Sequence, residues 1–189
     1  MSGRKIARYY QSPIDALLYD IAEKLSPMFK RYNLTPNHIT TIANIVRGLS
    51  LVMFYKKHYK VSAFLYIIGY YFDCMDGYFA RRYNMTTKFG DLYDHISDVV
   101  IHLILLWLLL RIKFRYKTNI LTLLALLLIG AFTHMGCQEI LYKKKSVLTI
   151  LQKLCYNVKY IKYTRFLGLG TFIFVLACII FNLNYLIGK

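Results

Sequence analysis

The acidic residues of this 189-residue chain are few and clustered. Five of the nine lie within the 26 positions from 73 to 98, and these are Asp73, Asp76, Asp91, Asp94 and Asp98. Carboxylates this close repel one another unless a cation holds them, and at a helix centre in a membrane each costs ~2.5–3.5 kcal/mol. Hard oxygen donors suit Mg²⁺ or Mn²⁺, with positions left for water and a diphosphate. The cluster therefore predicts a divalent metal site.

Four of these aspartates have helical spacing. Asp73 and Asp76 are three residues apart, and Asp94 and Asp98 are four apart, so each pair shares one face of a helix. Two antiparallel helices joined by a short loop would bring the pairs together. Asp91 begins the second helix, where we expect it to cap the helix or complement its dipole.

Small and basic residues beside the aspartates suit a phosphate-bearing ligand. Gly77 would let a ligand approach the helix backbone closely, and Ala80 keeps the next turn of that face low. Arg81 offers a planar fork of donors to phosphate oxygens. Gly90 lies one turn before Asp94 and would clear the facing helix surface.

Composition indicates a membrane protein. Of the residues, 57% are hydrophobic, and the net charge of +16 comes from Lys and Arg placed between long apolar runs. Anionic lipid headgroups are therefore better partners than nucleic acid, for which no recognition motif is present. The four cysteines, Cys74, Cys137, Cys155 and Cys178, lack the spacing of a disulfide framework, and we expect free thiols.

Hydrophobic patterning predicts an all-α integral membrane protein. Residues 12–30 should form an amphipathic interfacial helix, capped by Ser12 and ended or kinked at Pro27. The expected spans are roughly 39–55, 61–80, 91–110, 120–135 and 166–187. A hairpin within 166–189 would add a sixth, so the expected fold is a bundle of five or six transmembrane helices in one domain, 1–189.

Charges between the spans predict the orientation. The N-terminal side of the bundle carries 16 Lys and Arg residues against eight on the other side, which favours a cytoplasmic N-terminus and a cytoplasmic 81–88 loop. The basic, amphipathic segment 139–165 should lie along the membrane surface.

Several polar residues have two interpretations. His134, Gln138 and Glu139 either line a pocket for a second substrate or are exposed at the interface. Arg47 either faces the cavity, which we favour, or extends to the membrane surface. His95 follows Asp94 and points away from it, so we expect it to lie outside the ligand set.

The stretch DCMDGYFARRYNMTTKFGDLYDHISD resembles the CDP-alcohol phosphatidyltransferase motif. The eight fixed positions of that motif are Asp73, Asp76, Gly77, Ala80, Arg81, Gly90, Asp94 and Asp98. Upstream, the segment TPNHIT resembles the one that opens the first span in this family. The resemblance covers roughly residues 12–138.

The resemblance implies an enzyme of phospholipid biosynthesis that transfers a substituted phosphate from a CDP-alcohol to a hydroxyl and releases CMP. It implies that Asp73, Asp76, Asp94 and Asp98 bind two Mg²⁺ or Mn²⁺ ions, with Asp98 also the general base. It further implies that the cytidine-diphosphate group contacts Asn37, Thr40, Gly77, Arg81 and Thr87.

Three functions remain open. In the favoured one, CDP-diacylglycerol donates to a small polar alcohol, inositol ahead of glycerol 3-phosphate or serine. In the second, CDP-choline or CDP-ethanolamine donates to diacylglycerol. A cation transporter or channel is the non-enzyme alternative, and metal-dependent CMP release would separate it from the enzymes. Whether the protein forms a homodimer also stays open.

Overall fold

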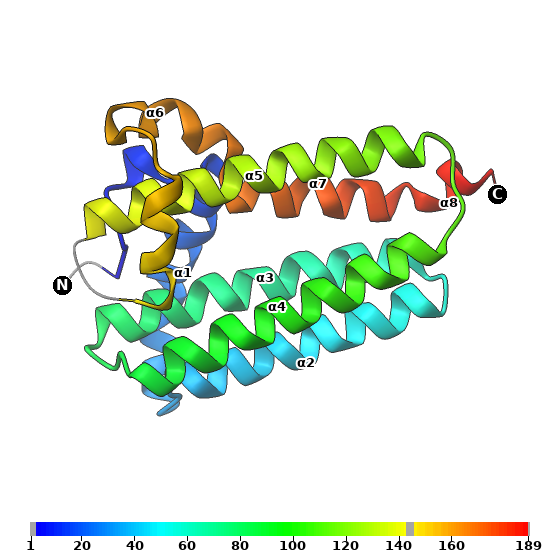
Figure 1. Cartoon of the computed structure of the whole chain (residues 1–189). Coiled ribbons are helices and arrows are strands. Elements are labelled where there is room, and N and C mark those ends of the chain that lie inside the picture. The colour runs from blue at the N-terminus through cyan, green and yellow to red at the C-terminus, as the bar shows by residue number, and fades with distance from the viewer. Residues whose placement is uncertain (1–2, 143–145, 189) are drawn as a thin grey trace.

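The computed structural model describes residues 3–142 and 146–188, which form helices and no strand (Figure 1). The α-helices are α1 (Pro13–Arg31), α2 (Pro36–Tyr55), α3 (Tyr59–Arg82), α4 (Lys88–Arg111), α5 (Lys117–Tyr142), α6 (Ile161–Thr164), α7 (Leu169–Phe181) and α8 (Leu183–Ile187). Short 3₁₀ helices are η1 (Arg8–Tyr10), η2 (Val147–Leu154), η3 (Val158–Tyr160) and η4 (Arg165–Leu167). The predicted all-helical class is confirmed.

The long helices form two groups joined by α3. Helices α2, α3 and α4 run side by side, and α5 and α7 form a second pair (Figure 1). Helix α3 packs on both α2 and α7. Helix α1 crosses one end of the bundle and packs against α3 and α7 there. This end holds the starts of α2, α4 and α7 and the ends of α3 and α5.

Small side chains let α2 and α3 approach closely. The hydroxyl of Ser50 donates to the Ser62 carbonyl at 2.8 Å, and both side chains are fully buried. Gly69 lies against the side chain of Arg47, where any added Cβ would collide with it. Close approach of this kind is typical of helix pairs in membranes, where packing and interhelical hydrogen bonds hold helices together.

Helix α1 begins as predicted but does not end at Pro27. Ser12 caps it by accepting a hydrogen bond from the Asp15 N–H. Pro27 lies inside the helix and cannot donate to the Glu23 carbonyl. The Ser26 hydroxyl donates to that carbonyl at 3.3 Å instead, and so does Arg82 at 3.3 Å. These two bonds replace the missing one, so the helix continues to Arg31.

Three segments are long and apolar enough to cross a membrane, which indicates a multi-pass membrane protein. They are Lys88–Arg111, Lys117–Tyr142 and Val158–Phe181. Helices α2 and α3 have sufficient length but are more polar, so the prediction of five or six spans stays a prediction. The fifth expected span, 166–187, is divided at Asn182 into α7 and α8.

The cysteine prediction was wrong for one pair. Cys137 and Cys155 form a disulfide with a Cα–Cα distance of 5.0 Å, whereas Cys74 and Cys178 are free. The pairing arises because Gly136 lets the backbone of Leu151 lie directly on α5. Segment η2 therefore packs along the end of α5, and Cys155 reaches Cys137.

Candidate active site

Three of the predicted aspartates meet where α3 ends and α4 begins. Carboxylate oxygens of Asp73, Asp94 and Asp98 all lie within 4.8 Å of one another. The helical spacing explains this, since each residue projects from the face that its helix turns toward the other. Oxygens this close can share a hard divalent cation.

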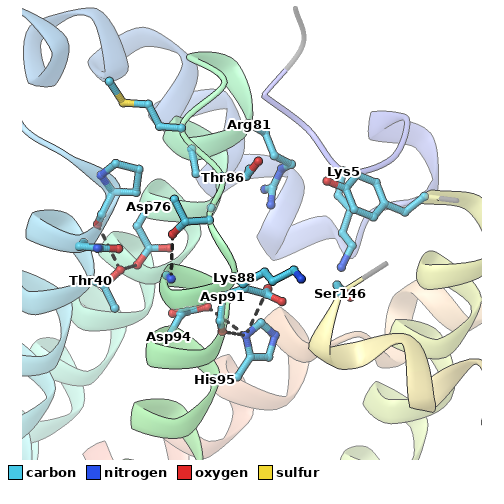
Figure 2. A pocket seen from close by; sticks show the side chains of 18 residues that line it. Lys5, Thr40, Asp76, Arg81, Thr86, Lys88, Asp91, Asp94, His95 and Ser146 are labelled. Carbon is cyan, nitrogen blue, oxygen red and sulfur yellow. Dashed lines mark hydrogen bonds and ion pairs between the residues drawn. The ribbon is translucent and has the colours of Figure 1, made fainter. Parts of the chain in front are cut away.

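Asp76 lies beside this group but is engaged by α2. Its side chain is buried, and its Oδ2 accepts a hydrogen bond from the Thr40 hydroxyl at 2.5 Å (Figure 2). The Thr40 oxygen also lies 3.1 Å from the Pro36 carbonyl of its own helix. Asp76 is thus placed next to the cluster, and its predicted role as a metal ligand stays a prediction.

Arg47 faces the aspartates, as the favoured interpretation held. It is 2% exposed, and its Nη1 donates to Asp73 at 3.0 Å and also to Asp98. Its Nη2 donates to the Asn44 carboxamide oxygen at 2.8 Å. A buried guanidinium offsets part of the repulsion between these carboxylates, because opposite charges attract strongly where water is excluded.

The chemistry of this donor set fits Mg²⁺ or Mn²⁺. The Asp94 Oδ1 atom is buried and has no hydrogen-bond partner among the described residues. A buried carboxylate oxygen left in that state is costly unless something positive reaches it. Asp73, Asp94 and Asp98 would hold the cation through oxygen alone, which those two ions prefer.

A cavity of about 320 Å³ opens beside the aspartates (Figure 2). The five residues predicted to contact cytidine diphosphate all line it, and these are Asn37, Thr40, Gly77, Arg81 and Thr87. They come from the starts of α2 and α4 and from the end of α3. The fold thus brings them together, and we call this space the first cavity.

Two glycines give the first cavity its shape. A Cβ added at Gly77 would lie 3.1 Å from the Arg81 Nη1, and one added at Gly90 would lie 2.9 Å from the Asn37 side-chain oxygen. Arg81 donates from Nε to the Gly3 carbonyl at 2.8 Å and from Nη2 to the Tyr19 hydroxyl at 3.3 Å. The guanidinium is therefore held in place, with Nη1 on the Gly77 side.

A second cavity, of about 170 Å³, adjoins the first one. Asp73 and Asp98 line it together with Gln11, Asp15, Tyr70, Gln138 and Glu139. Asp76, Gly77, Arg81 and Asp94 border both cavities. The two spaces therefore meet at the aspartate cluster.

Helix α1 contributes Asp15, which the sequence interpretation did not assign to the site. Burial raises the pKa of its carboxyl to about 6, although hydrogen bonds from the Tyr70 hydroxyl at 2.7 Å and the Gly170 N–H oppose the rise. In sequence, Asp15 belongs to the charged face of an amphipathic helix. No local pattern distinguishes it from the solvent-facing acids nearby.

Lys5, which borders both cavities, forms a partly buried ion pair with Glu139, which lines the second one. Burial lowers the pKa of Lys5, although the Glu139 carboxylate favours its charged form. Glu139 is 1% exposed, and its second carboxylate oxygen accepts from the Ser146 hydroxyl at 2.7 Å. The pair joins the N-terminal segment to the end of α5.

The three polar residues at the end of α5 are not exposed, and two of them line a cavity, but their role in binding a second substrate stays a prediction. His134 and Glu139 are buried, and Gln138 and Glu139 line the second cavity. Interfacial exposure of this group is therefore excluded. His95, which was expected to lie outside the ligand set, borders both cavities, and its Nδ1 lies 2.6 Å from the Asp91 carbonyl oxygen.

Asp91 and Thr87 organise the start of α4. Thr87 is the N-cap, and its hydroxyl oxygen accepts from the Gly90 N–H at 2.9 Å. Asp91 lies in the first turn, as predicted, and accepts a hydrogen bond from the Val147 N–H at 2.9 Å. That bond joins η2 to the loop end of the site.

Similarity to known proteins agrees with this geometry. A family model described as CDP-alcohol phosphatidyltransferase matches residues 33–187. The chain is 35% identical over 66 residues to CDP-diacylglycerol–glycerol-3-phosphate 3-phosphatidyltransferase of Rickettsia typhi, covering 33% of this chain and 37% of the relative. It is 25% identical over 142 residues to CDP-diacylglycerol–inositol 3-phosphatidyltransferase of Candida albicans, covering 63% and 61%.

A third relative is archaetidylinositol phosphate synthase of Pyrococcus horikoshii, 26% identical over 76 residues, with 40% of each chain covered. The matched stretches thus span between 37% and 61% of the length of these three curated relatives. No solved structure matches the chain. Because the family match takes in both aspartate helices and most of the chain, the protein belongs to the CDP-alcohol phosphatidyltransferase family.

Proposed function

We propose that this protein transfers the phosphatidyl group of CDP-diacylglycerol to inositol and releases CMP. The aspartate cluster between two cavities supports a reaction between a nucleotide-bearing donor and a separate acceptor. The two relatives above that are named as phosphatidyltransferases both have CDP-diacylglycerol in their names, which favours that donor over CDP-choline.

The observation that carries the choice of acceptor is the lining of the second cavity. Among the described residues, its two lysine or arginine side chains are Lys5 and Arg81. Lys5 is paired with Glu139, and Arg81, held by the Gly3 carbonyl and Tyr19, is assigned to the diphosphate of the donor, so neither cation is left for a phosphate on the acceptor. A phosphate acceptor needs cations that remain available. The carboxylates, carboxamides and phenols that line this cavity instead suit the hydroxyls of a neutral polyol.

The two adjoining cavities would hold the two reactants next to the aspartate cluster. A cytidine diphosphate in the first cavity would place its diphosphate toward Asp76 and Asp94, which border both spaces. An alcohol in the second cavity would approach from the side of Asp98. Fixing both reactants in this way supplies much of the rate of a transfer reaction.

The residues then have separate tasks. Bound divalent cations would supply charge neutralisation of the diphosphate and polarisation of its phosphorus. Asp98 takes the proton from the acceptor hydroxyl while the oxygen of that hydroxyl forms the new P–O bond. The P–O bond to CMP breaks, and Arg81 stabilises the charge that develops on the leaving phosphate. Arg47 holds Asp73 and Asp98 in position throughout.

We further propose that the active site faces the cytoplasm. In the sequence, the segments expected on the N-terminal side of the bundle carry 16 Lys and Arg residues, against eight on the other side. Basic segments on the N-terminal side would bind anionic headgroups and keep α1 at the membrane surface.

The test is an acceptor panel with purified protein and labelled CDP-diacylglycerol. We expect Mg²⁺- or Mn²⁺-dependent CMP release with inositol, and little with glycerol 3-phosphate or serine. Parallel reactions contain CDP-choline or CDP-ethanolamine with diacylglycerol. Transfer to glycerol 3-phosphate ahead of inositol would overturn the acceptor, and CMP release only from CDP-choline would overturn the donor.

Arg81→Lys should weaken donor binding by about 10- to 100-fold, the value of charged hydrogen bonds lost at a bidentate site. Lysine keeps the positive charge but lacks the planar guanidinium, whose N–H groups reach the Gly3 carbonyl, the Tyr19 hydroxyl and the cavity. The measurement is the affinity for CDP-diacylglycerol. Arg82→Lys is the matched control, because Arg82 bonds Tyr78 and the Glu23 carbonyl away from the cavity. If Arg81→Lys and Arg82→Lys bind CDP-diacylglycerol with equal affinity, the nucleotide does not bind beside Arg81.

A further inference from the structure

A chain of hydrogen bonds runs from α6 to the second cavity. The Gln138 carboxamide Nε2 lies 2.8 Å from His134 Nε2. A carboxamide nitrogen can only donate, so His134 Nε2 accepts and the proton of the neutral imidazole is on Nδ1. Nδ1 then donates to the Thr164 hydroxyl oxygen at 3.1 Å, and that hydroxyl donates to the Ile161 carbonyl at 3.4 Å. Each donor in the chain thus determines the role of the next group.

The chain fixes the orientation of the Gln138 carboxamide. Its nitrogen is turned toward His134, which leaves the carbonyl oxygen for the cavity that Gln138 and Asp98 both line. His134 itself is fully buried. A Cβ added at Gly168 would lie 3.0 Å from the imidazole Cδ2, so the ring is also confined by packing. The carboxamide is therefore pre-organised before any ligand arrives.

Both imidazole nitrogens of His134 are engaged in these hydrogen bonds, so the ring does not serve as an acid or base. Its effect on a ligand passes through Gln138. Asp98 accounts for the proton of the attacking hydroxyl, which leaves the other hydroxyls of a polyol to be recognised. A fixed carbonyl oxygen is suited to that task, since it accepts from a hydroxyl and offers nothing to an apolar group.

Resting on the proposed function, we propose that Gln138 is a specificity-determining residue that accepts a hydrogen bond from a non-reacting hydroxyl of the polyol acceptor. His134 and Thr164 are positioning residues that hold Gln138 in the accepting orientation. A buried acceptor of this kind discriminates against analogues that lack the hydroxyl, because it is left unpaired when they bind.

Gln138→Met keeps the length of the side chain and removes the carbonyl oxygen. We expect the KM for inositol to rise about tenfold, as for one lost hydrogen bond, while kcat and the KM for the donor change less than about twofold. The decisive measurement uses single-deoxy inositols with both proteins. One deoxy position should cost wild type about tenfold in kcat/KM and cost Gln138→Met nothing. Equal costs in both proteins at every position would overturn the assignment.

Variants of Thr164 test the positioning role. In Thr164→Val the Nδ1 proton loses its acceptor, so the imidazole can move its proton to Nε2 and donate to the Gln138 oxygen. The carboxamide then presents N–H to the cavity, and the preference among deoxy inositols should change. Thr164→Ser keeps the hydroxyl and should behave as wild type. Identical preferences in Thr164→Val and wild type would remove His134 and Thr164 from the proposal.

Equilibrium binding of labelled inositol to the detergent-purified, full-length variants provides a readout without turnover. Gln138→Met should bind inositol about tenfold more weakly than wild type. If wild type neither binds inositol nor transfers to it, the proposed acceptor fails and Gln138 loses this role. If wild type uses inositol and Gln138→Met binds it equally well, only the inference about Gln138 fails.

Discussion

Removal of divalent cations is expected to abolish CMP release, with a loss on the order of 10³-fold or more. The reason is the mutual proximity of Asp73, Asp94 and Asp98, whose carboxylate oxygens lie within 4.8 Å of one another. A diphosphate brought beside them adds further negative charge, which Arg47 and Arg81 alone do not offset. The measurement is CMP release after EDTA treatment and after readdition of Mg²⁺ or Mn²⁺. Full turnover in EDTA would contradict the metal site.

The control for this prediction is the fold of the metal-free protein. Arg47 bridges Asp73 and Asp98, so EDTA should leave the helical circular dichroism unchanged and the activity recoverable. Arg47→Met removes that bridge, and truncating one partner of a buried pair costs about 3–5 kcal/mol. Its melting temperature should therefore fall further in EDTA than in Mg²⁺, because cations then replace the lost charge. An equal fall in both conditions would separate Arg47 from the metal site.

The aspartate cluster could be predicted from sequence because its geometry is local. Residues three or four apart on a helix share a face wherever that helix packs. The five-residue connection between α3 and α4 then leaves few ways to orient the two faces. Asn37 and Thr40 belong to the same local arrangement, since a capping box at Thr35 starts α2 at Pro36.

The contributions of α1 and of the N-terminal segment to the second cavity could not be predicted, because they depend on packing between distant segments. Asp15 enters the second cavity only because α1 lies across α3 and α7, where Tyr70 and Gly170 meet its carboxylate. Lys5 reaches Glu139 across 134 positions of sequence. Neither arrangement has a periodicity or spacing that a single sequence displays.

The wrong prediction at Cys137 and the continuation of α1 through Pro27 have the same origin. Pro27 is a helix breaker by local rules, but Ser26 and Arg82 satisfy the carbonyl that it leaves without a donor. Cys137 pairs with Cys155 because a glycine admits the backbone of η2 onto α5. In both cases a tertiary contact overrides a sound local expectation.

Asp98→Asn is expected to retain most of its donor binding while transfer falls about 10²–10⁴-fold, the usual loss for a general base. An asparagine carbonyl oxygen can still accept the hydrogen bond from Arg47 and can still meet a hard cation, but the amide cannot take the proton from the acceptor hydroxyl. The local structure should therefore survive, and the melting temperature should stay close to that of wild type. The measurement is single-turnover CMP release at fixed Mg²⁺, together with affinity for CDP-diacylglycerol.

Asp73→Asn is the matched comparison, because Arg47 donates to Asp73 as well as to Asp98 and both residues line the second cavity. If the main role of Asp73 is to bind the metal, Asp73→Asn should lose affinity for the metal and for the donor together. Raising the Mg²⁺ concentration should then restore part of the transfer rate. Extra Mg²⁺ should not restore Asp98→Asn, since a missing proton acceptor is not replaced by occupancy of the site. If Asp98→Asn transfers at the wild-type rate, Asp98 is not the general base. A rate that Mg²⁺ fully restores would instead make Asp98 a ligand alone.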